Sequence, residues 1–216
     1  MIAVIDYGAG NLHSVCNGLR AMGAEFLVAR EPGDLDRSTR ILLPGVGHFG
    51  QMMQALERQR LAAPLRGRLA SGTPYFGICL GMHALFEVSE EAPETPGLGL
   101  LPGAVRRFPV GLRVPHMGWT ALELVGRGIL ARPGMYYFAH SYYVPDSAEG
   151  VSAYARHGLR FAAVIERGNL AGCQFHPEKS GSHGLELLKK WAFPGQDPPL
   201  APTLDFGPGT LDPEDV

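Results

Sequence analysis

Hydrophobic and polar positions follow two different periods along the first half of the chain. Apolar side chains recur every three or four positions across residues 11–23, which predicts an amphipathic helix that ends near Gly23. Residues 51–70 predict a further helical stretch, broken near Pro64. Four short apolar runs have the length of buried strands: residues 2–8, 25–29, 40–47 and 74–81. Strands that alternate with helices are typical of an α/β fold, in which helices cover both faces of a mostly parallel sheet.

The second half of the chain changes to strands joined by glycine-rich turns. The segments predicted as strands are residues 112–125, 134–145, 151–158, 159–168 and 169–178. They predict antiparallel strands added to the C-terminal half of the sheet, closed by a helix at residues 184–193. We therefore expect one domain over residues 1–193. A Pro- and Gly-rich acidic tail at residues 194–216 follows, on the surface or without fixed structure.

Composition narrows the class of protein without identifying it. Of 216 residues, 45% are hydrophobic and 19% are charged, as in ordinary globular domains. The 19 Lys and Arg nearly balance the 21 Asp and Glu, and no basic stripe stands out, so we expect no nucleic acid partner. No apolar run is long enough to cross a bilayer, and the start of the chain has no signal-peptide pattern. The three cysteines are widely spaced and suggest no disulfide framework, so we expect a cytoplasmic protein with no membrane partner.

One cysteine has neighbours that a core cysteine does not need. In FGICLGMHALF, residues 76–86, Gly77 and Gly81 lie two positions before and after Cys79. A nucleophile at a sharp turn from a strand into a helix leaves no room for side chains at those two positions. The helix that we expect to start near Cys79 would also place partial positive charge beside the sulfur. The alternative is a small core residue in a glycine-rich turn, and a core position is what we expect for Cys16 and Cys173.

A thiol nucleophile needs a base, and the base needs an acid to orient it. Among the eight histidines, His176 stands out because it begins the sequence HPE at the end of an apolar strand. Pro177 cannot donate to a sheet ladder, so we expect regular pairing to end there. Glu178 is close enough in sequence to reach one ring nitrogen of His176 while the other faces the sulfur. The alternative is a strand end followed by a surface glutamate.

The segment PGVGHFG, residues 44–50, follows the third predicted strand, which we expect beside the strand of the nucleophile. Gly45 and Gly47 free the backbone to turn its N–H groups toward a ligand. Together with the N–H of Leu80, such a segment can form an oxyanion hole. The alternative is a tight turn with no further role.

At this point the sequence resembles the class I (triad) glutamine amidotransferases, and most closely the glutaminase subunits of imidazole glycerol phosphate synthases. The resemblance covers roughly residues 1–193. It depends on motifs that come in that family's order, namely DYGAGNLHSV, LPGVGHFG, GICLGM, VPHMGW, HSYY and FHPEKS.

The resemblance implies a flavodoxin-like domain that hydrolyses glutamine to glutamate and ammonia without a cofactor or metal. It also implies a (βα)8-barrel cyclase as the partner in a heterodimer, which would use the ammonia in histidine biosynthesis. The positions of the family's motifs imply roles for three groups of residues in this sequence. The catalytic triad would be Cys79, His176 and Glu178. The residues near glutamine would be Gly47, His83, Glu91, Ser141 and Tyr142, and those near the partner would be Asn11, Trp119, Tyr137 and Lys179.

Two residues depart from the family pattern. His83 stands where a glutamine that contacts substrate is usual, one helical turn past Cys79, and Thr120 stands where asparagine is usual after HMGW.

Two other interpretations stay open from the sequence alone. In a dinucleotide-binding domain, Gly8 and Gly10 would open the first helix and Glu31 would contact a ribose, although His13 occupies the third glycine position. A stand-alone cysteine hydrolase of the same fold, acting on γ-glutamyl or peptide bonds, would be active without a partner.

Overall fold

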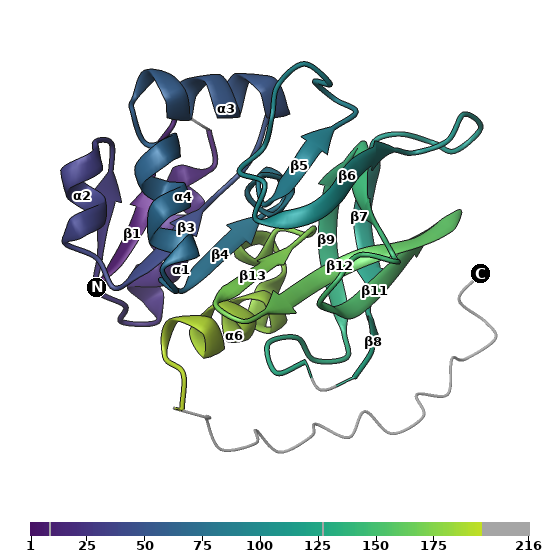
Figure 1. Ribbon diagram of the computed structural model, residues 1–216. Helices are drawn as coiled ribbons and strands as arrows, with labels where there is room; N and C mark the ends of the chain where they lie inside the picture. The colour runs from purple at the N-terminus through teal and green to yellow at the C-terminus, as the bar shows by residue number, and fades with distance from the viewer. Residues whose placement is uncertain (9, 127, 196–216) are drawn as a thin grey trace.

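The chain folds around one large mixed sheet (Figure 1). The computed structural model describes residues 1–8, 10–126 and 128–195. Eleven strands make up this sheet, and the longest path through it is β2-β1-β3-β4-β13-β12-β10-β6-β5, with β11 and β8 joined beside β12. A separate two-stranded sheet is formed by β7 and β9. The mixed α/β architecture confirms the predicted fold class.

Most strands coincide with short apolar runs, and each strand pairs with a neighbouring strand. They are β1 (Ile2–Ile5), β2 (Phe26–Ala29), β3 (Arg40–Leu43), β4 (Tyr75–Ile78), β5 (Phe86–Ser89), β6 (Leu101–Arg107), β7 (His116–Ala121), β8 (Glu123–Leu124), β9 (Met135–His140), β10 (Tyr142–Pro145), β11 (Val151–His157), β12 (Leu159–Arg167) and β13 (Leu170–Cys173). The N-terminal strands and β13 pair in parallel, as in β3 with β4 and β4 with β13. The neighbours of β12 pair antiparallel, which confirms the change of pattern in the second half.

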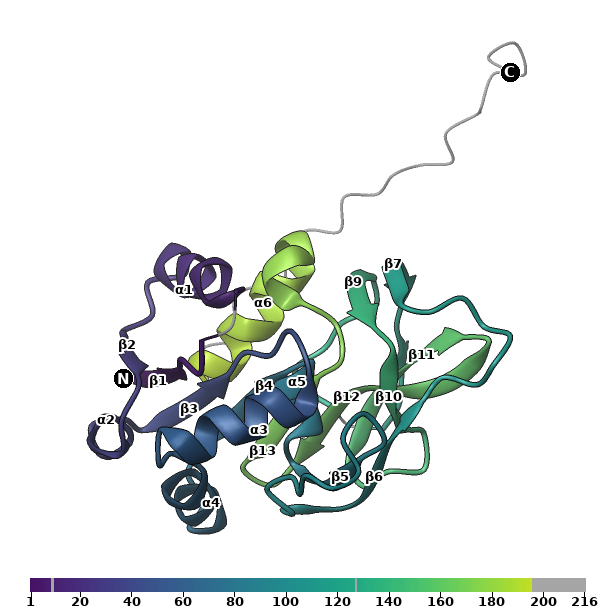
Figure 2. The ribbon, with the colours of Figure 1, turned by 90° about the horizontal axis from the view of Figure 1, so that it is seen from above.

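Helices cover the parallel part of the sheet on both faces, as Figure 2 shows from above. The helices are α1 (Leu12–Ala21), α2 (Pro32–Asp36), α3 (Phe49–Arg58), α4 (Ala62–Ala70), α5 (Leu80–His83), the short 3-10 helix η1 (Pro177–Lys179) and α6 (Gly181–Ala192). In that view α1 and α6 lie on one side of the strands, and α3 and α4 lie on the other. Among the described residues, no helix has both the length and the apolar character that crossing a membrane requires.

The alternation along β1 divides the core into two layers. Ile2 and Val4 pack into the cluster that contains the apolar faces of α1 and α6, whereas Ala3 and Ile5 pack into the cluster that contains α3 and α4. Side chains at successive strand positions point to opposite faces, so a run with no polar residue is what a strand buried on both sides requires.

Several predicted elements differ from the structure. The strand predicted over residues 112–125 is divided into β7 and β8, and the one predicted over residues 134–145 is divided into β9 and β10. The helix predicted over residues 51–70 is broken at Gln59–Leu61 and not at Pro64. Pro64 is tolerated because it lies in the first turn of α4, where an N–H group has no acceptor within the helix. The helix expected to start near Cys79 is very short, because α5 ends at His83 and Phe86 already belongs to β5. The strand before His176 ends at Cys173.

The predicted boundary between domain and tail stays a prediction. From residue 196 onward the tail lies outside the described residues.

Candidate functional site

Cys79 occupies a strained turn between β4 and α5. Its backbone angles are φ 51° and ψ −105°, in a region that residues with a side chain rarely adopt. A side chain at Gly77 would collide with the backbone of Gly81, and one at Gly81 would collide with the carbonyl of Leu43. The glycines that flank the cysteine are therefore required by close backbone approach, as the sequence predicted.

The loop after β3 comes close to the same turn. A Cβ at Gly45 would lie 2.5 Å from the backbone nitrogen of Gly81 and 2.8 Å from the carbonyl oxygen of Ile78. Gly45 is thus needed for contact with the nucleophile turn rather than for conformational freedom. Gly47 differs, because its φ is +101° and nothing lies within 4 Å of an added Cβ.

His176 and Glu178 form the predicted pair. The Nδ1 of His176 and the Oε1 of Glu178 are 2.9 Å apart, and both side chains are almost completely buried. The amide Nδ2 of Asn11 also donates to Oε1 of Glu178, at 3.1 Å. Asn11 is buried and touches the predicted acid, a contact that sequence reasoning missed when it assigned this residue to a partner interface.

Burial and neighbouring charges determine the protonation states of His176 and Glu178. Burial lowers the pKa of His176, but hydrogen bonding with Cys79 and Glu178 and their negative charges outweigh it and raise the pKa to about 10. Burial alone would raise the pKa of Glu178, but the hydrogen bond and positive charge of His176 hold it below the usual range. At neutral pH the geometry therefore favours an imidazolium held against a carboxylate.

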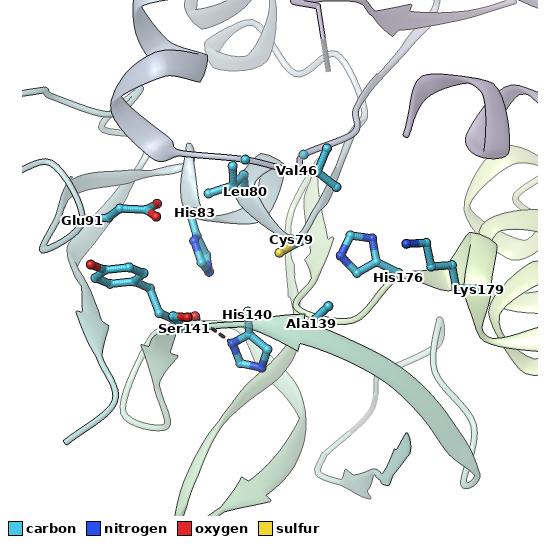
Figure 3. A pocket seen from close by; sticks show the side chains of 13 residues that line it. Val46, Cys79, Leu80, His83, Glu91, Ala139, His140, Ser141, His176 and Lys179 are labelled. Atoms are coloured by element: carbon cyan, nitrogen blue, oxygen red, sulfur yellow. Dashed lines mark hydrogen bonds between the residues drawn. The ribbon is translucent and has the colours of Figure 1, made fainter. Parts of the chain in front are cut away.

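A cavity of about 250 Å³ opens above Cys79 (Figure 3). It brings together nearly all residues predicted for catalysis and substrate binding: Gly47, Cys79, Leu80, His83, Glu91, Ser141, Tyr142 and His176. Lys179, predicted at the partner interface, also lines it. In Figure 3 the sulfur of Cys79 lies between the rings of His83 and His176, and Glu91 lies on the far side of His83 from His176.

Gly47 and Leu80, the residues predicted to form the oxyanion hole, both line this cavity. Leu80 begins α5, where helix geometry leaves the first N–H groups without helical acceptors. In the described part of the chain, neither Leu80 nor Gly47 donates its N–H to another backbone group. Glu91 lies nearby, and its Oε2 accepts a hydrogen bond from the N–H of Phe49 at 2.9 Å.

Gln174 is a site residue that sequence reasoning missed. Its side chain is fully buried, its Nε2 donates to Sγ of Cys79 at 3.5 Å, and its Oε1 lies 2.8 Å from Nε2 of His83. An amide oxygen only accepts hydrogen bonds, so His83 carries its proton on Nε2. The position of Gln174 in the strand-end sequence GCQFHPE, on the same face as His176, was the available signal.

A second chain of hydrogen bonds leads into the wall of the cavity. His140 Nδ1 donates to the carbonyl of Tyr142 at 2.8 Å, and its Nε2 lies 3.0 Å from Nδ1 of His116. His116 Nε2 lies 2.9 Å from Oγ1 of Thr120. Because a carbonyl only accepts, the direction is fixed from Thr120 through both imidazoles to Tyr142. Burial lowers the pKa of His116 to about 4 and that of His140 well below its usual value, so both rings are neutral.

The remaining predicted interface residues meet beside the cavity on the two-stranded sheet. Trp119 of β7 pairs directly with Tyr137 of β9, their ring centroids are 6.0 Å apart, and Trp119 is 53% exposed. The amine of Lys179 lies 5.9 Å from the centroid of the Tyr137 ring. Cys16 and Cys173 are both buried and free, as expected for core positions.

The glutamine amidotransferase class-I family matches residues 3–193, and the chain belongs to this family. The imidazole glycerol phosphate synthase subunit HisH of Moorella thermoacetica is 47% identical over 195 residues, which cover 88% of this chain and 93% of that protein. The subunit of the same name from Cyanothece sp. is 48% identical over 198 residues, which cover 87% of this chain and 93% of that one. These relatives confirm the resemblance drawn from the sequence motifs.

Solved structures share the fold. A crystal structure of a glutamine amidotransferase has a TM-score of 0.72 at 23% identity and covers 89% of this chain and 99% of its own. The glutaminase domain of Trypanosoma brucei CTPS with bound acivicin has a TM-score of 0.63 at 16% identity and covers 88% and 92%. The dinucleotide-binding interpretation finds no support here, since Glu31, its supposed ribose contact, instead caps α2.

Proposed function

We propose that Cys79, His176 and Glu178 are the catalytic triad of a glutaminase. The chain is a glutamine amidotransferase, and the function that its relatives indicate is that of the glutaminase subunit of an imidazole glycerol phosphate synthase. The observation that carries the assignment of the triad is the strained backbone of Cys79 beside a buried His176–Glu178 pair. Backbone strain of this kind persists only where the surrounding structure enforces it, and it is common at active sites.

The mechanism assigns one role to each group. The thiolate of Cys79 attacks the side-chain amide carbon of glutamine, and a C–S bond forms. The N–H groups of Gly47 and Leu80 stabilise the oxyanion of the tetrahedral intermediate. His176, held by Glu178, gives its proton to the leaving nitrogen, so the C–N bond breaks and ammonia is released.

Hydrolysis of the thioester completes the cycle. The neutral imidazole of His176 removes a proton from water, which attacks the thioester carbon. The C–S bond breaks and glutamate leaves, which restores the thiolate and the imidazolium. Gln174 donates to the sulfur of the free chain at 3.5 Å and so helps to position it for the attack.

The cavity wall suits the α-amino acid end of glutamine. Glu91 supplies a carboxylate for the α-ammonium group, while Ser141 and Tyr142 supply polar groups at the same end. His83 lies on the helix that starts at Cys79 and lines the same space.

The partner is a separate (βα)8-barrel cyclase, with which the chain forms a heterodimer. Free ammonia is mostly protonated near neutral pH and is then not nucleophilic, so a synthesis that consumes it needs direct transfer. The exposed apolar side chains of β7 and β9 support an interface on the two-stranded sheet. Met117 and Trp119 on β7 are 64% and 53% exposed, and Met135 on β9 is 47% exposed. The cytoplasmic location stays a prediction.

The test is glutamine hydrolysis by the purified chain, alone and with a (βα)8-barrel cyclase. We expect the rate to be highest in the complex with the cyclase's ligand present, and amide-labelled glutamine to deliver its label to the cyclase product. Full activity of the isolated chain, unchanged by the cyclase, would favour the stand-alone hydrolase instead. No hydrolysis of glutamine in any combination would contradict the proposed function itself.

A further inference from the structure

A single hydroxyl group holds both polar backbone atoms of Val46. The Oη of Tyr7 donates to the carbonyl oxygen of Val46 at 3.1 Å, and the N–H of Val46 donates back to Oη at 3.0 Å. A tyrosine hydroxyl has one proton and can also accept, so the two bonds use it in both capacities. Tyr7 belongs to DYGAGNLHSV, a motif of which only Asn11 has so far been placed at the site, through its contact with Glu178.

The position of these bonds matters because Val46 and Gly47 separate two cavities. Both residues line the catalytic cavity, and both also line a neighbouring cavity of about 510 Å³ between the loop after β1 and α3. Tyr7 lines only the second of these. The carbonyl of Val46 is therefore turned toward Tyr7 and the second cavity.

The orientation of that carbonyl determines the orientation of the next N–H. In the described part of the chain the only cis peptide bond is Val114–Pro115, so the Val46–Gly47 peptide is trans. In a trans peptide the carbonyl and the following N–H point in opposite directions. With the carbonyl of Val46 held by Tyr7, the N–H of Gly47 points away from Tyr7, and Gly47 itself lines the catalytic cavity.

Without a restraint, this peptide has little to hold it. Gly47 has a φ of +101° and open space around its Cα, and a glycine adopts several backbone conformations at similar cost. Tyr7 is well placed to supply the restraint, because two contacts hold the residue before it, Asp6. The Nε of Arg30 pairs with Asp6 at 2.9 Å, and Gln59 donates to the backbone carbonyl of Asp6 at 3.0 Å.

We propose that Tyr7 is a positioning residue for the oxyanion hole, which it keeps open by holding the Val46–Gly47 peptide with its N–H toward Cys79. The inference deepens the proposed function and depends on it. Tyr7 does not line the catalytic cavity, so its effect should appear in the transition state, where the oxyanion exists, and not in the binding of glutamine. Burial raises the pKa of Tyr7 far above its usual value, and the hydroxyl thus keeps its proton throughout the working range of pH.

The chain contains a matched control for this contact. The Oη of Tyr136 donates to the carbonyl of Arg132 at 3.1 Å and accepts from the N–H of the same residue at 3.4 Å. This is the same arrangement in a loop that lines neither cavity. Tyr7→Phe and Tyr136→Phe thus delete the same pair of bonds and keep the ring, one beside the oxyanion loop and the other distant from it.

The experiment compares the two variants with the wild type, each in complex with the cyclase. Removal of an oxyanion-hole donor costs about 10²–10³ in kcat, and release of its restraint should cost less, so we expect Tyr7→Phe to lower kcat by about 10–100-fold. The KM for glutamine should change by less than about threefold, because the ground state has no oxyanion. Tyr136→Phe should keep the wild-type kcat.

A second measurement separates the oxyanion hole from general damage to the site. Alkylation of Cys79 by iodoacetamide displaces iodide and builds no oxyanion, so its rate should be equal in wild type and Tyr7→Phe. A fall in alkylation equal to the fall in kcat would overturn the inference, as would an unchanged or increased kcat. A wild-type complex that hydrolyses no glutamine would instead contradict the proposed function.

Discussion

The Nε2 of His83 lies 2.8 Å from the Oε1 of Gln174, and the amide nitrogen of the same Gln174 lies 3.5 Å from the sulfur of Cys79. The histidine therefore sets the orientation of the amide that faces the nucleophile. Burial lowers the pKa of His83 to about 4, so it is a neutral donor at physiological pH. Its Nδ1 is buried without a hydrogen-bond partner among the described residues, which leaves an acceptor beside the substrate cavity.

This relationship predicts the effect of replacing His83. Glutamine, the usual residue of the family, can also donate to Oε1 of Gln174, so His83→Gln should keep kcat within about threefold and lower the KM for glutamine or leave it unchanged. His83→Leu cannot donate and leaves the buried amide oxygen unpaired, which should reduce the free energy of unfolding by about 1–3 kcal/mol. Steady-state kinetics and denaturant titration measure the two effects. Complete loss of activity in His83→Gln would assign a catalytic or structural role to the imidazole itself.

Two substitutions of Cys79 separate the loss of glutaminase activity from the relief of backbone strain. Cys79→Ala and Cys79→Gly should both abolish glutamine hydrolysis, while the cyclase should still run on added ammonia. Only glycine relieves the positive φ, whose cost is about 1–3 kcal/mol, and glycine loses about 0.5–1 kcal/mol of that gain through chain entropy. The unfolding free energy of Cys79→Gly should thus exceed that of Cys79→Ala by about 1 kcal/mol.

Two controls belong to that experiment. Cys16→Ala and Cys173→Ala should remain active, with at most a loss of stability, since both sulfurs are buried in the core. Residual glutaminase activity in Cys79→Ala within tenfold of wild type would show that Cys79 is not the nucleophile.

The His176–Glu178 pair predicts a stability that falls at alkaline pH. The pKa of His176 is raised from 6.5 to about 10 in the folded state, so its contribution is complete below pH 6.5 and is lost as pH rises toward 10. Glu178→Gln removes one of the negative charges responsible and should flatten this decline. The measurement is the free energy of unfolding between pH 6 and pH 10, with the exposed Glu94→Gln as the control. An identical decline in wild type and Glu178→Gln would contradict the assignment.

Thr120 should be essential as a donor, although it departs from the family pattern. Its hydroxyl begins the chain that ends at the carbonyl of Tyr142, and Thr120→Val leaves Nε2 of the buried His116 without a donor. We expect a loss of about 1–3 kcal/mol of unfolding free energy for Thr120→Val. Thr120→Ser and Thr120→Asn both keep a donor and should recover most of it. Equal losses in all three variants would mean that donation of a hydrogen bond to His116 does not account for the contribution of Thr120 to stability.

Much of the site was determined by local sequence. Gly77 and Gly81 predict the nucleophile turn because the reason for them is short-range, namely the lack of space around a sharp bend. The proposed triad was also indicated by local signals, since Glu178 is two residues from His176 and its Oε1 lies 2.9 Å from the Nδ1 of that ring. The alternation of strands and helices predicted a sheet covered on both faces, because the period of apolar positions is a property of each segment by itself.

Contacts between distant segments were decided only by the tertiary structure. Asn11 is 167 positions from Glu178, Tyr7 is 39 positions from Val46, and Gln174 is 91 positions from His83. Each of these polar side chains has several possible partners in the sequence, and only the order of the strands in the sheet brings one of them within hydrogen-bond distance. The short α5 has the same origin, because Phe86 pairs with Leu101 on β6, and the helix expected to start near Cys79 ends before it. Local spacing thus indicated the residues that are proposed to carry the chemistry, and packing over long sequence separations decided what holds them in place.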